Sequence, residues 1–112
     1  AAMQVILVCT TVDSEPLAHS IAGALVDRQL AACVQIHPID SVYRWQGQIE
    51  QGKEFKLTCK TTADLYRQVE HAIRELHPYE LPAIYAMPLH LIYAPFEQWV
   101  LDETEVNRHP RA

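Results

Sequence analysis

The spacing of hydrophobic residues changes several times along the chain, and each period predicts an element. A short apolar run at 5–10, rich in β-branched residues, is too short for a helix and predicts a strand buried on both faces. Apolar residues then recur at helical spacing, which predicts a helix over 15–29. Asp13 or Ser14 is placed to cap the start of this helix.

The middle of the chain predicts a long β-hairpin. Apolar and polar residues alternate over 31–45 and again over 49–61, and a turn containing Gly47 joins the two stretches. Pro38 interrupts the first strand and indicates a bulge or a sheet edge, because proline has no backbone N–H to donate. Strands of about 12 residues extend for roughly 40 Å. That length exceeds a compact domain of this size, so we expect the ends of the hairpin to project.

The second half of the chain repeats the helix and the strand. A helical apolar stripe follows the threonines at 61–62 and ends at Pro78, which predicts a second helix with a threonine cap. The segment 83–92 predicts a fourth strand or a bent pair of strands. Pro95 opens a short last helix. We expect the chain to fray from about residue 106.

The order of these elements predicts the fold class. A β-α-β-β-α-β order with a C-terminal helix is typical of an α+β, ferredoxin-like split sandwich, here a single domain over 1–112 with a long projecting hairpin. Both main helices should cover one face of an antiparallel sheet, which leaves the other face bare. Tyr43 and Trp45 lie on the projecting strands and need a partner to cover them. Self-association through sheet edges is therefore predicted, with these two aromatic residues as interface packing.

Charge and composition narrow the range of functions. Nine Lys and Arg stand against 14 Asp and Glu, and the resulting net charge of −5 argues against a nucleic-acid partner. No apolar run of about 18 residues predicts a membrane span, and no basic segment at the start indicates a signal peptide. Three cysteines without Cys-x-x-Cys spacing predict reduced thiols. These features favour a cytoplasmic protein and leave the periplasm as the alternative.

Several short motifs carry a resemblance to a known family. In chain order they are 5–11 (VILVCTT), 30–34 (LAACV), 43–47 (YRWQG), Glu54 with Leu57, 60–62 (KTT), 77–82 (HPYELP) and Trp99. Together they resemble the CutA divalent-cation tolerance family over about residues 4 to 102. The resemblance implies a homotrimer, similar in shape to the PII signalling proteins, in which sheet edges pair between subunits. It also implies binding of divalent or soft metal ions, with copper as the cofactor.

The resemblance further implies a copper site. In the family its ligands are a cysteine of the first strand and a His-His pair before Pro-Tyr, which correspond here to Cys9 and His77. Leu76 replaces the first histidine of that pair, so one imidazole is missing. Thiolate and imidazole both suit copper, but a tight site needs three or four ligands. From the residues alone, Cys9 as a core thiol and His77 as a cation at a helix C-terminus stay open as alternatives.

A polar cleft between subunits is the second predicted site. Glu54 and Lys60 lie on the same face of one predicted strand, and Tyr79 follows His77 on a segment stiffened by prolines. The resemblance implies that such residues line an inter-subunit cleft. An ordinary solvated strand face with surface ion pairs is the alternative.

Three functional hypotheses follow from these sites. The first is a trimeric, copper-linked metal-binding protein. The second is a PII-like sensor of a small anionic or polar molecule, and the third is a structural or anchoring trimer with an unidentified protein partner. An enzyme is not predicted, because residues 9–13 lack the Arg and Gly of an acylphosphatase loop and the chain has no Gly-x-Ser-x-Gly.

Overall fold

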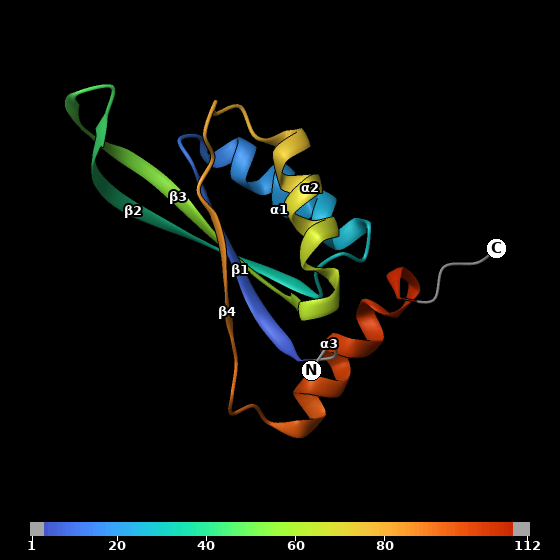
Figure 1. Ribbon diagram of the computed structural model, residues 1–112. Helices are drawn as coiled ribbons and strands as arrows, with labels where there is room; N and C mark the ends of the chain where they lie inside the picture. The colour runs from blue at the N-terminus through green and yellow to red at the C-terminus, as the bar shows by residue number, and fades with distance from the viewer. Residues whose placement is uncertain (1–3, 109–112) are drawn as a thin grey trace.

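Four antiparallel strands form one sheet in the order β2-β3-β1-β4, and helices α1 and α2 lie together on one of its faces (Figure 1). The computed structural model describes residues 4–108. Its elements are β1 (Val5–Val12), α1 (Glu15–Asp27), β2 (Cys33–Trp45), β3 (Gln48–Thr62), η1 (Ala63–Leu65), α2 (Tyr66–Leu76), β4 (Ile84–Pro88), α3 (Ala94–Glu103) and η2 (Glu105–Asn107). The predicted ferredoxin-like α+β fold is confirmed. Over this range no helix is both long and apolar enough to span a membrane.

Local signals explain where α1 begins and ends. The Ser14 hydroxyl accepts a hydrogen bond from the Leu17 backbone N–H at 3.3 Å, and a proline occupies the first turn. These are the usual features of a helix N-terminus. Gln29 has a φ of 56°, in the left-handed region where helices commonly end. For this reason α1 ends at Asp27, two residues earlier than the sequence predicts.

The hairpin of β2 and β3 is continuous and projects beyond the helices (Figure 1). Its strands stay in one register from Cys33↔Lys60 to Trp45↔Gln48. The turn residues Gln46 and Gly47 both have positive φ, 49° and 79°, which is the geometry of a two-residue type I′ turn. Pro38 pairs with Phe55 without a bulge. Since β2 is an edge strand, the edge interpretation of Pro38 is the correct one.

The core fills the space between the sheet and the two main helices. Leu57 and Val8 of the sheet are fully buried beside Leu25 of α1 and Ile73 of α2. A second, smaller cluster lies where α3 packs, at the end of the sheet away from the hairpin tip (Figure 1). Its members are Val5, Ala32 and Val100, with Leu89, Ile92 and Phe96 partly buried around them.

Three predictions of element boundaries are wrong in detail. The second helix begins with the 3₁₀ turn η1 rather than directly after a threonine cap. Only 84–88 is a strand within the predicted 83–92, so there is no second strand in that segment. The frayed tail does not begin at about 106, because η2 is formed and the Arg108 side chain is only 6% exposed. Residues 109–112 lie outside the described residues.

The hydroxyl of Thr10 is a buried polar group whose removal is expected to stabilise the protein. Thr10 is fully buried, and its Oγ1 has no hydrogen-bond partner within residues 4–108. Thr10→Val keeps the shape and removes the unpaired hydroxyl, so the free energy of unfolding should rise by about 1 kcal/mol. Chemical denaturation at fixed protein concentration measures this change. Thr61→Val is the matched control, because the Thr61 hydroxyl donates to the Leu30 carbonyl at 2.7 Å and its loss should destabilise. A less stable Thr10→Val would contradict this account.

Candidate functional site

His77 connects the end of α2 to the sheet. Its backbone is extended, at φ −90° and ψ 132°, as expected before a proline. The imidazole is 8% exposed, its Nε2 lies 2.7 Å from the Thr11 carbonyl oxygen of β1, and its Nδ1 accepts from the Tyr79 backbone N–H at 3.2 Å. Because a carbonyl only accepts, Nε2 must carry the ring proton. His77 is therefore a neutral imidazole with both nitrogens hydrogen-bonded.

Tyr79 connects the same segment to β3. Its hydroxyl donates to Oε2 of Glu54 at 2.9 Å, and its ring meets the His77 ring edge-on, with centroids 4.7 Å apart at an interplanar angle of 65°. Burial, the hydrogen bond to Glu54 and the charges of Glu54 and Asp13 together raise the pKa of Tyr79 far above its usual value. Tyr79 thus stays a protonated donor. The three predicted residues His77, Tyr79 and Glu54 form one connected cluster.

Cys9 lies on β1 and faces away from the two main helices. Its neighbours Val8 and Thr10 are on the opposite, helix-covered face, since side chains alternate along a strand. The thiol residue is 1% exposed, and Thr58 of β3 and Tyr85 of β4 lie directly across from it. It is two positions from Thr11, the residue whose carbonyl binds His77. Both predicted metal ligands are thus attached to the same strand.

Lys60 does not join this cluster within one chain. Its ammonium donates to Oε1 of Gln35 on β2 at 2.6 Å. It is six positions from Glu54 along β3, a separation of about 20 Å. The predicted cleft residues therefore divide into a joined pair, Glu54 with Tyr79, and a separate lysine near the other end of the strand.

The predicted interface residues lie on the projecting part of the hairpin. Tyr43 is 48% exposed and Trp45 is 36% exposed. The β2–β3 register places both on the same sheet face as Glu54, the face that carries neither α1 nor α2. Exposed aromatic residues on a bare sheet face are typical of a binding surface.

The donor set for a metal is incomplete in a single chain. Cys9, Cys33 and Cys59 are all free thiols. Burial, with smaller contributions from the other two thiols, raises the pKa of Cys59 to about 12, so Cys59 is a poor ligand. Over residues 4–108 no group of three or more His, Cys, Asp or Glu could hold a metal ion. The thiol of Cys9 and the imidazole of His77 suit a soft ion chemically, but neither His77 nitrogen has an unused lone pair.

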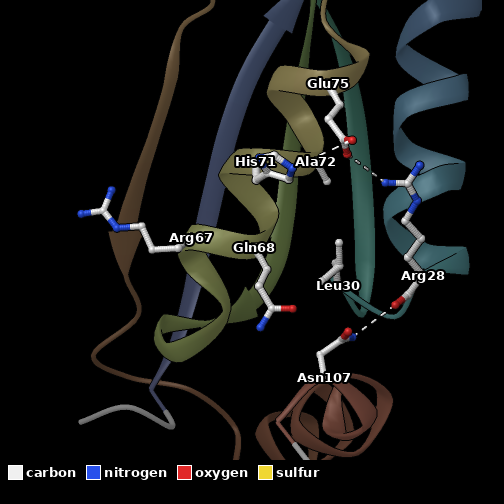
Figure 2. A pocket seen from close by; sticks show the side chains of 8 residues that line it. All are labelled: Arg28, Leu30, Arg67, Gln68, His71, Ala72, Glu75 and Asn107. Atoms are coloured by element: carbon white, nitrogen blue, oxygen red, sulfur yellow. Dashed lines mark hydrogen bonds and ion pairs between the residues drawn. The ribbon is translucent and has the colours of Figure 1, made fainter. Parts of the chain in front are cut away.

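A separate hollow of about 430 Å³ lies between α2, the segment that follows α1, and η2, and it contains none of the predicted site residues (Figure 2). The Glu75 carboxylate lies 3.6 Å from Arg28 and 3.9 Å from His71. The hollow is lined by Arg28, Leu30, Arg67, Gln68, His71, Ala72, Glu75 and Asn107. These charged groups are largely paired with one another, so the cluster at His77 is the better candidate site.

Sequence reasoning missed the role of Thr11. Its contribution to the site is a backbone carbonyl, which every residue has, so no motif could have marked it. The antiparallel sheet with its long hairpin, and the His-Pro-Tyr segment attached to that sheet, define this class of protein: a ferredoxin-like α+β protein in which a histidine after the second helix is hydrogen-bonded to the first strand.

Comparison with known proteins then gives the family. The family model described as CutA1 divalent ion tolerance protein matches residues 6–103, and the chain belongs to this family. The divalent-cation tolerance protein CutA of Thermus thermophilus is 39% identical over 99 residues, covering 88% of this chain and 96% of its own length. The human Protein CutA is 38% identical over 85% of this chain, which spans 54% of the human sequence. None of these names is that of an enzyme.

A solved structure shows the same fold. It is described as the periplasmic divalent cation tolerance protein CutA from Archaeoglobus fulgidus and superposes with a TM-score of 0.87. Its sequence is 32% identical, and the match covers 89% of this chain and 98% of that one. The family role is therefore divalent-cation tolerance.

Proposed function

We propose that this protein serves divalent-cation tolerance as a homotrimer that binds copper, or another divalent cation, and not as an enzyme. The observation that carries the proposal is the attachment of both candidate ligands to β1. Cys9 is part of the strand, and His77 is hydrogen-bonded to it at Thr11. A thiolate and an imidazole form a soft donor pair of the kind that copper prefers.

Exposed apolar residues support self-association. Most of them lie on the hairpin, on β4, on the loop after β4, where Leu91 is 94% exposed, and on α3. The set comprises Val42, Tyr43, Trp45, Ile49, Tyr85, Met87, Leu91, Tyr93 and Trp99. Two protein ligands fall short of the three or four in a tight site. A neighbouring subunit or water would complete the shell, and a trimer brings the required subunits together.

Replacing the thiol tests the proposed site. Cys9→Ser is expected to weaken Cu(I) binding by about a hundredfold, because a serine hydroxyl is a hard, protonated donor whereas Cu(I) prefers thiolate. A competitive titration against a chelator of known affinity measures the loss. Cys33→Ser is the matched control, since Cys33 lies on edge strand β2 and should leave the affinity unchanged. If Cys9→Ser and the parent bind Cu(I) with equal affinity, Cys9 is not a ligand of the site.

A second candidate function uses the same segment without a metal. The partly buried Tyr79–Glu54 hydrogen bond favours a polar cleft, which a neighbouring subunit's Lys60 could complete in a trimer. Such a cleft would serve a PII-like sensor of a small anionic molecule, or an anchoring trimer that holds a protein partner. Lys60→Ala should abolish binding of an anionic ligand and leave Cu(I) binding intact.

The three free thiols favour the cytoplasm as the compartment. The periplasm, named for the Archaeoglobus relative, is the alternative. The net charge of −5 disfavours nucleic acid as a partner, because the phosphate backbone is also negatively charged.

A further inference from the structure

Any metal that binds His77 must first break a hydrogen bond. A metal ion needs the lone pair of an imidazole nitrogen. At Nδ1 that lone pair accepts the Tyr79 backbone N–H, and at Nε2 the position is taken by the proton donated to the Thr11 carbonyl. In the form described by the structure, His77 is closed to a ligand at both nitrogens.

Both routes to ligation break the hydrogen bond between His77 and the Tyr79 backbone N–H. Binding at Nδ1 takes the lone pair directly from the Tyr79 N–H. Binding at Nε2 requires the ring proton to move to Nδ1, where it would point at the Tyr79 N–H, and two donors facing each other do not bond. The contact between the Tyr79 amide and His77 is therefore lost whichever nitrogen is used.

Tyr79 is also held at its other end. Its hydroxyl donates to Glu54 at 2.9 Å, and Pro78 and Pro82 limit the backbone conformations of the segment between α2 and β4. Moving the Tyr79 backbone away from His77 strains or breaks the contact with Glu54. The two hydrogen bonds of Tyr79 should therefore open together.

We propose that the Tyr79–Glu54 hydrogen bond is a latch that keeps segment 77–82 closed over His77 and opposes metal binding until it opens. This inference rests on the proposed metal-binding function. Where only the open form binds, the apparent affinity is reduced by the fraction of chains that are open. By linkage, bound metal must in turn favour the open segment to the same extent.

Tyr79→Phe tests the latch by removing only the hydroxyl. Cu(I) should then bind about fivefold more tightly than in the parent, the effect of one net hydrogen bond. Tyr66→Phe is the matched control, because the Tyr66 hydroxyl donates to Glu70 at 3.0 Å on α2, in a tyrosine–glutamate pair unconnected with His77. Its affinity for Cu(I), measured by the same competitive titration, should equal that of the parent.

Amide hydrogen exchange at residue 79 gives a reading that needs no metal. Exchange in the metal-free protein should be about fivefold faster in Tyr79→Phe than in the parent, and unchanged in Tyr66→Phe. Equal Cu(I) affinities of parent and Tyr79→Phe, or equal exchange rates at residue 79, would overturn the latch and leave the metal-binding function standing. Absence of Cu(I) binding in both proteins would reject the metal-binding function and the latch with it.

Discussion

Replacing Trp45 with glutamate is expected to convert the proposed trimer into monomers at micromolar concentration. Trp45 is 36% exposed near the tip of the hairpin, on the sheet face that α1 and α2 leave bare. Loss of a buried interface tryptophan typically costs about 2–4 kcal/mol of binding free energy, and a buried carboxylate adds a desolvation penalty. By symmetry the change occurs at every interface of a trimer. Sedimentation velocity over a concentration series measures the result.

Val26→Glu provides the control for that experiment. Val26 is 42% exposed on α1, so the substitution adds the same charge to an exposed apolar residue on the helical layer. This variant should keep the parent's assembly. A Trp45→Glu protein that sediments as a trimer and unfolds at the parent's temperature would show that the hairpin is not the interface.

Removal of the Arg108 side chain is expected to lower the free energy of unfolding by about 3 kcal/mol. The guanidinium is buried and donates to Thr62 Oγ1 at 3.1 Å, to Thr104 Oγ1 at 2.9 Å and to the Leu101 carbonyl. It joins the end of α3 to the end of β3, and the carboxylate of Asp64 lies 3.9 Å away. Arg108→Ala leaves these oxygens without their donor in a buried position.

Chemical denaturation of Arg108→Ala at fixed protein concentration measures this loss. Arg74→Ala is the matched control, because Arg74 is exposed on α2 and its removal should change stability by less than about 0.5 kcal/mol. If both variants unfold at the same denaturant concentration, the contacts of Arg108 contribute no net stability. Amide hydrogen exchange should show the loss of stability in α3, because the hydrogen bonds of Arg108 hold this helix against the sheet.

The fold could be predicted from the sequence because its signals are local. The alternation before and after Gly47 predicts the hairpin, and Ser14 marks the start of α1. Each of these features depends on residues within a few positions of one another. For the same reason the order of elements was sufficient to predict the ferredoxin-like sheet.

The site could be predicted only in part because its decisive contacts join distant parts of the chain. His77 and Tyr79 were predicted as neighbours, and the structure connects them to Glu54 within one chain. The bond from His77 to the Thr11 carbonyl spans 66 positions and ends on a backbone atom, so no spacing reveals it. Arg108 was placed in a frayed tail, because its acceptor on the sheet, Thr62, is 46 positions away.

Copper binding by Cys9 and His77 is best tested by a competitive Cu(I) titration of the reduced, metal-free protein against a chelator of known affinity. We expect a simple ratio of copper to subunit and an affinity well above that of an ordinary surface thiol, because Cys9 and His77 act together. Weak or non-stoichiometric binding would contradict copper binding at this site. Leu76 would then mark the absence of a copper site, and the cleft at Glu54 and Tyr79 would become the place to seek a different ligand.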